Sequence, residues 1–371
     1  MRKTPLNKFH REMGARMVDF AGWEMPLLYS GIIDEHKQVR GSGGFFDVSH
    51  MGRVWCAGKD VRRFLERLCT RRISDMAPGQ CRYSLVCNEA GGVRDDVLVY
   101  RLNDDEFMLV VNASNREKLL GHFDEVRGEL DVAIDDRTLK TVMIALQGPK
   151  VMSVIAKFSE EITALKRYRF VTKGVLMVKA IISRTGYTGE DGVEAIVPAS
   201  VARMGIGLLL REVDLAAPDA VIRPAGLGAR DTLRMEAGMP LYGHELGEET
   251  PAWASGLGFA ISLDKADYAP NEPFVGMAAV REHAEQGTPR RLVGMLIEGR
   301  RSARQGMPIT SEGAEVGVVT SACVSPTLGR PIAMGYLDAA LAQDGAAVTI
   351  DARGRTLDAV LTPLPFYNRP K

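Results

Sequence analysis

Several features of common protein classes are missing from this chain of 371 residues. No apolar run reaches the roughly 18 residues that a membrane-spanning helix needs. The start, Met1-Arg2-Lys3-Thr4-Pro5, lacks the apolar core of a signal peptide. The 47 basic and 47 acidic residues give zero formal net charge, so no overall field favours nucleic acid or an anionic membrane. We therefore expect a cytoplasmic protein that binds neither.

Metal and disulfide chemistry also lack their usual signals. The five cysteines are Cys56, Cys69, Cys81, Cys87 and Cys323. Their odd number and the lack of a C-x-x-C pair are typical of reduced, buried thiols. The six histidines show neither H-x-x-x-H nor H-E-x-x-H spacing, so we expect no metal site. His50 lies among polar residues that interrupt an apolar turn, and its simplest interpretation is a hydrogen-bonded turn histidine.

The common nucleotide and hydrolase motifs are absent as well. Three G-x-G pairs, beginning at Gly41, Gly205 and Gly256, lack the third glycine of a dinucleotide-binding turn. The chain also contains neither a P-loop nor a G-x-S-x-G elbow. Nucleotide-dependent redox chemistry and phosphoryl transfer are therefore disfavoured.

Hydrophobic periodicity predicts an α+β protein. A helix with a basic exterior begins at Val61, and a helix near residues 119–126 follows the strand at 107–111. Further strands are predicted at residues 83–87, 97–100, 142–146, 175–182 and 193–197. Further helices are predicted after Gly148-Pro149, with Val151, Val154, Ile155 and Phe158 on the apolar stripe, at 201–210, and from about Gly228 to Gly238.

The pattern changes between about residues 264 and 287. Beyond a helix at 277–285, short strand candidates are separated by Gly, Pro and Asp turns. They are residues 291–297, 316–321, 333–337, 347–350 and 357–362. This spacing predicts a small closed or sandwiched β domain.

The segment from Gly91 to Asp96 combines a glycine turn with two adjacent carboxylates. Neighbouring residues of a strand point to opposite faces, so only one carboxylate can face a given cavity. Asp96 shares its face with Leu98 and Tyr100, which makes it the functional candidate. Asp95 is better explained as a turn residue that caps backbone N–H groups.

A second segment, from Arg184 to Glu194, has three glycines in seven residues. This is more than a simple hairpin needs and suggests close approach to a ligand. Glu194 lies in an apolar strand on the same face as Ile196, so burial predicts a partner for its charge. A planar ligand with adjacent N–H donors, such as a pterin, is one candidate partner. An exposed glutamate on an edge strand is the alternative.

The third segment places Arg230 in the first turn of a helix, where the helix dipole disfavours a cation. The position suggests an anionic partner. A salt bridge to Asp231 or to a distant residue is the alternative. Arg234 and Glu236 are interpreted as structural.

These three segments, in this order, resemble the aminomethyltransferase family, the T-proteins of the glycine cleavage system. The resemblance covers the whole chain. Its other segments are Phe20-Ala21-Gly22-Trp23-Glu24-Met25-Pro26, Phe46-Asp47-Val48-Ser49-His50-Met51-Gly52, Val111-Asn112-Ala113, Met239-Pro240-Leu241-Tyr242-Gly243, Met334-Gly335-Tyr336 and Pro365-Phe366-Tyr367. Two places depart from the family pattern, namely Arg94 and the stretch 250–255.

The resemblance implies an α+β fold with three domains in a cloverleaf around a central folate channel. Residues 1–51 with 142–265 would form a discontinuous folate-binding domain, and residues 52–141 an inserted α+β domain. Residues 280–371 would form a C-terminal β-barrel-like domain.

The resemblance also implies the reaction. The lipoyl arm of H-protein carries an aminomethyl group, and tetrahydrofolate, a cosubstrate, accepts the carbon. The products are 5,10-methylenetetrahydrofolate, ammonia and dihydrolipoyl H-protein. The aminomethyl carbon is an iminium-like electrophile and pterin N5 is the nucleophile, so no protein nucleophile is required.

By similarity, Asp96 is the catalytic carboxylate, which orients folate, stabilises developing positive charge or transfers a proton. Glu194 would hold the pterin and Arg230 would bind folate, a folate carboxylate being one candidate contact. The channel lining implied by the family comprises Met51, Tyr83, Tyr100, Asn112 and Tyr187, with Tyr367 and Arg369 as weaker candidates.

Two other functions share this fold. One is a folate-dependent demethylase of sulfonium or methoxy compounds. The other is a non-catalytic folate-binding factor, whose K-G-C-Y-x-G-Q-E motif is absent here. Basic clusters at residues 62–72, 166–169 and 290–304 are candidate docking surfaces for an acidic H-protein, although each is also compatible with a solvated face.

Overall fold

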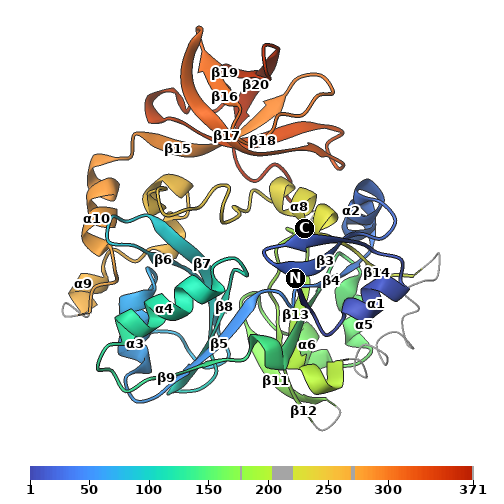
Figure 1. Cartoon of the computed structure of the whole chain (residues 1–371), viewed down its shortest axis with the longest axis vertical. Coiled ribbons are helices and arrows are strands. Elements are labelled where there is room, and N and C mark those ends of the chain that lie inside the picture. The colour runs from blue at the N-terminus through green and yellow to red at the C-terminus, as the bar shows by residue number, and fades with distance from the viewer. Residues whose placement is uncertain (176–177, 203–219, 269–271, 370–371) are drawn as a thin grey trace.

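The computed structural model describes residues 1–175, 178–202, 220–268 and 272–369 (Figure 1). Within these residues the strands form three open sheets and one closed barrel. No helix in this part of the chain is both long and apolar enough to cross a membrane. The mixed fold and the closed C-terminal barrel confirm the predicted α+β class.

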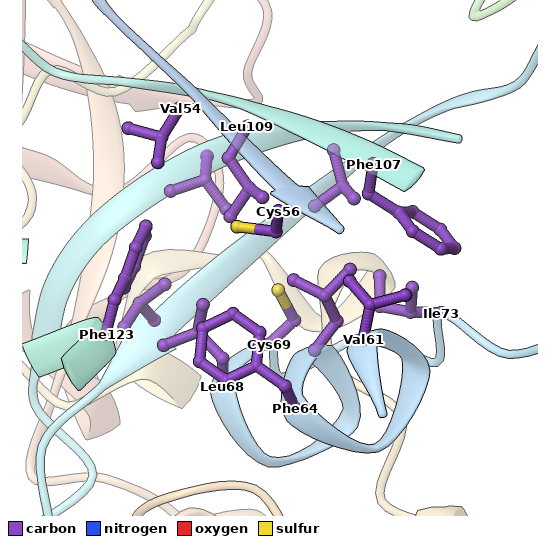
Figure 2. Close-up of a cluster of buried hydrophobic side chains, with 14 of the residues drawn as sticks. Val54, Cys56, Val61, Phe64, Leu68, Cys69, Ile73, Phe107, Leu109 and Phe123 are labelled. Carbon is purple, nitrogen blue, oxygen red and sulfur yellow. The ribbon is translucent and has the colours of Figure 1, made fainter. Parts of the chain in front are cut away.

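The five-stranded sheet follows the order β6-β7-β8-β5-β9. Its strands are β5 (Gly52–Ala57), β6 (Cys81–Cys87), β7 (Val93–Arg101), β8 (Glu106–Val111) and β9 (Ala133–Asp136). Helices α3 (Val61–Leu68) and α4 (Arg116–Arg127) pack on one face. Between them, the rings of Phe64 and Phe123 meet edge to face at 6.0 Å, next to the buried Cys56 and Cys69 (Figure 2). These thiols pack as core residues, as predicted.

The six-stranded sheet follows the order β11-β12-β13-β10-β4-β14. Its strands are β4 (Gly44–Asp47), β10 (Thr141–Gln147), β11 (Phe170–Val175), β12 (Val178–Ser183), β13 (Gly192–Pro198) and β14 (Arg223–Pro224). The strand predicted at 175–182 is confirmed from residue 178 onward as β12, but the sequence did not reveal β11, which pairs with it antiparallel. The helix predicted at 201–210 lies outside the described residues from 203 onward.

Helices cover this sheet and the strands at the N-terminus. They are α1 (Asn7–Glu12), α2 (Ile32–Gly41), α5 (Val151–Ala156), α6 (Glu160–Thr163) and α8 (Leu227–Glu236). The predicted stripe after Pro149 is buried except for Phe158, which is 57% exposed because α5 ends before it. The sheet β1-β3-β2, formed by β1 (Arg2–Lys3), β2 (Arg16–Phe20) and β3 (Trp23–Leu28), contacts α8 through β3.

The barrel closes in the order β15-β18-β17-β16-β19-β20. Its strands are β15 (Arg290–Ile297), β16 (Pro308–Ser311), β17 (Ala314–Ser325), β18 (Arg330–Asp338), β19 (Ala347–Asp351) and β20 (Thr356–Thr362). The sequence did not reveal β16, a four-residue strand whose one fully buried side chain is Ile309. Helices α9 (Lys265–Tyr268) and α10 (Met277–Gln286) precede the barrel. Helix α10 confirms the helix predicted at residues 277–285.

Helix α8 connects the six-stranded sheet to the barrel, which lies at the top of Figure 1. Arg234 donates to Glu245 at 2.8 Å and to Ser321 of β17 at 2.8 Å. Glu236 accepts from Thr327, just beyond β17, at 2.8 Å. Both residues therefore fix the barrel to the helix, consistent with their predicted structural role.

Candidate active site

Asp96 lies on β7 with its carboxylate held on both sides. Its Oδ2 accepts the hydroxyl of Tyr83 at 3.0 Å, and its Oδ1 accepts the side-chain amide of Asn112 at 2.7 Å. Tyr83 comes from the neighbouring strand β6, and Asn112 directly follows β8. Three adjacent segments of the five-stranded sheet thus fix the orientation of one half-buried carboxylate.

Asp95 is not the turn residue that the sequence suggested. It lies within β7 and is fully buried. Its carboxylate accepts the backbone N–H of Asn112 at 3.0 Å and side-chain amides from Asn112 and Asn115 at 2.8 and 2.7 Å. The Asn112 amide therefore binds both aspartates, so the two carboxylates are coupled although they leave the strand on opposite faces.

Burial raises the pKa of Asp96, while the hydrogen bonds from Tyr83 and Asn112 act in the opposite direction. Burial and the charge of Asp96 raise the pKa of Asp95 as well. Two neighbouring carboxylates with raised pKa values are more basic than exposed aspartates. Such a pair suits proton transfer or the stabilisation of a nearby cation.

Phe259 extends this site and was missed by sequence reasoning. Its ring stacks on Tyr83 with centroids 6.0 Å apart and an interplanar angle of 26°, yet the residue is 63% exposed. The short helix that carries it, Gly258–Ala260, has no distinctive pattern, so only the tertiary contact identifies the residue. An exposed ring beside Tyr83 offers an apolar surface to a ligand.

Glu194 lies on β13, which pairs with both β10 and β12. The alternative of an exposed edge strand is therefore wrong, and Glu194 is 7% exposed. Its Oε2 accepts the hydroxyl of Thr185 at 2.6 Å. Burial raises the pKa of Glu194, which Arg230 opposes.

A chain of hydroxyl groups connects β7 to Glu194. The Tyr100 hydroxyl lies 3.0 Å from the Ser183 hydroxyl, which lies 2.7 Å from that of Thr185, the residue that donates to Glu194. Tyr100 is completely buried. Tyr100 is therefore connected to the Glu194 carboxylate through this chain of hydroxyl groups.

The glycine-rich turn before Glu194 has a packing explanation. A Cβ atom at Gly186 would lie 1.9 Å from Gln147 Oε1, and one at Gly192 would lie 2.0 Å from the Leu146 carbonyl oxygen. Glycine is thus required where the turn packs against the end of β10. The predicted close approach is to the protein's own strand.

Arg230 lies in the first turn of α8, as predicted. The alternative of a salt bridge to Asp231 is wrong, because Asp231 accepts from Arg234 at 2.9 Å. The Arg230 guanidinium lies 5.0 Å from the centroid of the Tyr187 ring, and its buried Nη1 has no hydrogen-bond partner in the described residues. Burial lowers its pKa, with Glu194 acting in the opposite direction.

Tyr187 lies between the Asp96 and Arg230 parts of the site. Its hydroxyl donates to the Pro240 carbonyl oxygen. Burial raises the pKa of Tyr187, and both Asp96 and Arg230 are near enough to influence that pKa. The candidate residues Asp96, Tyr83, Asn112, Glu194, Arg230 and Tyr187 are thus brought together by two different sheets and helix α8.

The remaining candidates lie at the margins. Met51 packs against the buried cluster that contains Tyr100. The ring of Tyr367 lies 3.9 Å from the Arg40 guanidinium, and Arg369 pairs with Asp191 at 3.4 Å. Asp191 borders a cavity of about 70 Å³ that is also lined by Thr185, Met239 and the exposed Arg167.

This arrangement can bind a polar, planar molecule. The Glu194 carboxylate can accept two adjacent N–H groups, the unpaired nitrogen of Arg230 can donate to an oxygen, and Asp96 can act on an amine. Arg230 is close enough to both Glu194 and Tyr187 to influence their pKa values, and Tyr187 is likewise close to Asp96.

Comparison with known proteins gives consistent matches along the chain. Residues 6–265 match the GCVT N-terminal domain, and residues 290–368 match the glycine cleavage T-protein C-terminal barrel domain. An aminomethyltransferase from Rubrobacter xylanophilus is 47% identical, with 100% of this chain and 95% of the relative covered. One from Desulfitobacterium hafniense is 41% identical, with 100% and 99% covered. The crystal structure of the glycine cleavage system aminomethyltransferase T from Bartonella henselae has a TM-score of 0.90 at 32% identity, covering 99% of this chain and 98% of that one.

Proposed function

The chain belongs to the glycine cleavage T-protein family of aminomethyltransferases, and we propose that Asp96, Glu194 and Arg230 form its tetrahydrofolate site. The protein is an aminomethyltransferase of the glycine cleavage system. The observation that carries the site assignment is the Asp96 carboxylate fixed between Tyr83 and Asn112, near Tyr187, which is itself close to Arg230. We also propose the domain boundaries given by the family resemblance, 1–51 with 142–265, 52–141 and 280–371.

The residues present fit a reduced pterin. The N2 amino group and N3–H of a pterin are adjacent donors, and the Glu194 carboxylate has the bidentate geometry to accept both. The Thr185 hydroxyl already occupies one lone pair of Oε2 and holds the carboxylate in place. Arg230, which has an unpaired nitrogen, can donate to an oxygen of the same molecule.

In the reaction, the aminomethyl carbon leaves the lipoyl sulfur of H-protein and becomes bonded to folate N5 and N10. Two folate N–H protons end on the departing sulfur and ammonia. When bound, tetrahydrofolate supplies the two amines that take the carbon. Asp96 orients those amines, stabilises positive charge that develops on them and accepts a proton. Tyr83 and Asn112 hold Asp96 in the orientation for these tasks.

H-protein is the proposed partner, and residues 300–304 are the proposed part of its docking surface. Arg300, Arg301 and Arg304 are exposed and form no ion pair within the described residues. By contrast, the cluster at 62–72 is largely neutralised, for example by Glu272, which binds both Arg63 and Arg67. Gln305 donates to the Gly243 carbonyl at 3.2 Å, so this loop lies beside the Tyr242–Gly243 turn that follows α8.

Turnover distinguishes the proposed function from its alternatives. The purified protein is mixed with tetrahydrofolate and either aminomethyl-loaded H-protein or a sulfonium methyl donor. We expect 5,10-methylenetetrahydrofolate only from the loaded H-protein. Methyltetrahydrofolate formed from the sulfonium compound would instead indicate a demethylase. Folate binding without either product would indicate a non-catalytic folate-binding factor.

Charge reversal tests the docking surface. Replacing Arg300, Arg301 and Arg304 by Glu should raise KM for H-protein at least tenfold and leave the Kd for tetrahydrofolate unchanged. Reversal of Lys166 and Arg167, which are also exposed and form no ion pair within the described residues, is the matched control. If the control has the larger effect on KM for H-protein, the docking surface is assigned to the wrong cluster.

A further inference from the structure

The turn between β4 and β5 is fixed on both sides of His50. Asp47 Oδ1 accepts the backbone N–H of Ser49 at 2.8 Å. The fully buried Arg53 donates from Nη1 to the Ser49 carbonyl at 2.9 Å and also to the Met51 carbonyl. The backbone before and after His50 is therefore held in one conformation, and the position of the imidazole follows from it.

The His50 side chain is buried without a hydrogen bond. The residue is 3% exposed, and its ring meets that of Phe20 edge to face at 5.4 Å and 87°. The buried Nδ1 has no partner in the described residues, and Nε2 forms no hydrogen bond there either. The predicted hydrogen-bonded turn histidine is thus wrong. A buried polar group without a partner destabilises the folded protein, so its retention requires an explanation.

A second unpaired group lies close by. Val48 and Met51, on either side of His50, pack in the same cluster as Ala229 and Tyr100. Arg230 follows Ala229 on α8, and its buried Nη1 also has no partner in the described part of the chain. Arg230 is close enough to His50 to influence its pKa, and burial lowers that pKa to about 3. The imidazole is therefore neutral near pH 7 and offers one donor and one acceptor.

We propose that His50 is a further folate-binding residue, whose imidazole hydrogen-bonds the polar edge of the pterin beside Arg230. The proposal rests on the folate site proposed above. In a pterin the 4-oxo group is adjacent to N3–H. A pterin held at N3–H by Glu194 therefore presents its oxo group to the neighbouring Arg230, and the His50–Arg230 region supplies the two open nitrogens. His50 is a binding and positioning residue here, not a proton carrier.

The Arg53 guanidinium gives this role a structural basis. Arg53 also donates to the Thr141 hydroxyl at 2.8 Å and to the Thr141 carbonyl at 2.9 Å, at the start of β10. The same buried cation thus ties the His50 turn to the sheet that carries Glu194 on β13. His50 and Glu194 are placed on one rigid unit, as a precise binding site requires.

Three variants test the proposal. His50→Phe keeps the ring contact with Phe20 and removes both nitrogens, whereas His50→Gln retains a donor and an acceptor. His122→Phe is the matched control, because His122 is also buried, has an unpartnered Nε2, and lies on α4. Calorimetry gives the Kd for tetrahydrofolate, steady-state assays with loaded H-protein give kcat and KM, and thermal unfolding gives Tm.

We expect His50→Phe to raise the Kd and KM for tetrahydrofolate about tenfold, with a smaller loss in kcat and no change in KM for H-protein. Its Tm should stay equal or rise, because an unpaired buried polar group is removed. His50→Gln should recover part of the affinity, and His122→Phe should bind folate like the wild type. A fall in Tm with equal losses for folate and H-protein would mean that His50 is only structural.

A measurement on the unaltered protein complements the variants. With ¹⁵N-labelled histidine, tetrahydrofolate should shift the ring-nitrogen signals of His50, assigned by their loss in His50→Gln, and leave those of His122 in place. Unshifted His50 signals at saturating folate would overturn the inference while leaving the proposed function intact. Failure of the wild type to bind tetrahydrofolate would instead overturn the proposed function itself.

Discussion

The Tyr83 hydroxyl donates a hydrogen bond of 3.0 Å to Asp96 Oδ2, so the carboxylate on β7 is oriented by its neighbour on β6. Asn112 holds the other carboxylate oxygen at 2.7 Å. Neither contact neutralises the charge of Asp96. The carboxylate is therefore oriented by neutral groups and forms no salt bridge within the described part of the chain.

Asp96→Asn removes the negative charge and keeps the shape of the side chain. We expect folate affinity to stay within about threefold of the wild type, because the proposed pterin contacts are Glu194 and Arg230, which this variant leaves unchanged. Formation of 5,10-methylenetetrahydrofolate from loaded H-protein should fall about 10²–10⁴-fold, the range for loss of a positioned acid–base group. Turnover near the wild-type rate would contradict the role assigned to Asp96.

Tyr83→Phe tests the same contact through pH dependence. Burial holds the pKa of Asp96 above its ordinary value of 3.8, and the Tyr83 hydrogen bond lowers it. Because the proposed role requires the ionised carboxylate, activity should fall as pH drops through the raised pKa. Loss of the hydroxyl should move this acid limb of the kcat/KM profile to higher pH. Tyr336→Phe, in the barrel, is the control, and an acid limb that moves to lower pH contradicts the assignment.

Glu194→Ala removes the proposed pterin anchor. Charge-assisted hydrogen bonds contribute about 1.5–3 kcal/mol each, so the Kd for tetrahydrofolate measured by calorimetry should rise at least tenfold. The rate at saturating folate should fall less than the affinity. Glu89→Ala, in the exposed turn before β7, should leave the Kd unchanged. An unchanged Kd in Glu194→Ala would mean that the pterin is held elsewhere.

The sequence predicts those features that depend on neighbouring positions in the chain. Alternation along a strand placed Asp96 on the face of Leu98 and Tyr100, and placed Glu194 with Ile196, because side-chain direction in a strand depends only on neighbouring positions. Helix α8 and the barrel were likewise predicted from short-range periodicity and turns.

The misses depend on contacts between distant segments. The burial of Asp95 depends on hydrogen bonds from Asn112 and Asn115, which lie between β8 and α4. Phe259 belongs to the site only because its ring stacks on Tyr83, 176 positions earlier in the chain. Gly186 and Gly192 pack against the end of β10, and no local sequence pattern reveals this contact. Such partners are set by tertiary packing.

The attachment of the barrel gives a final prediction, which concerns stability. Burial opposes the ionisation of Glu236, but hydrogen bonds from His36, Ser325 and Thr327 outweigh it and lower the pKa to about 2. The ordinary value is 4.5, so the ionised group stabilises the folded protein above about pH 4.5. This contribution is lost as pH falls toward 2.

Glu236→Gln should therefore lower the stability of the folded protein only at pH values at which Glu236 is ionised. Removal of one partner from a buried charge cluster costs about 3–5 kcal/mol, so at pH 7 the variant should unfold several degrees below the wild type. The gap in Tm should narrow as pH falls from about 4.5 toward 2, because the wild type loses the stabilisation from ionised Glu236 over this range. Glu12→Gln, which weakens an exposed pair with Lys8, should show no comparable gap at any pH. A gap for Glu236→Gln that stays constant with pH would show that its ionisation does not hold the barrel to α8.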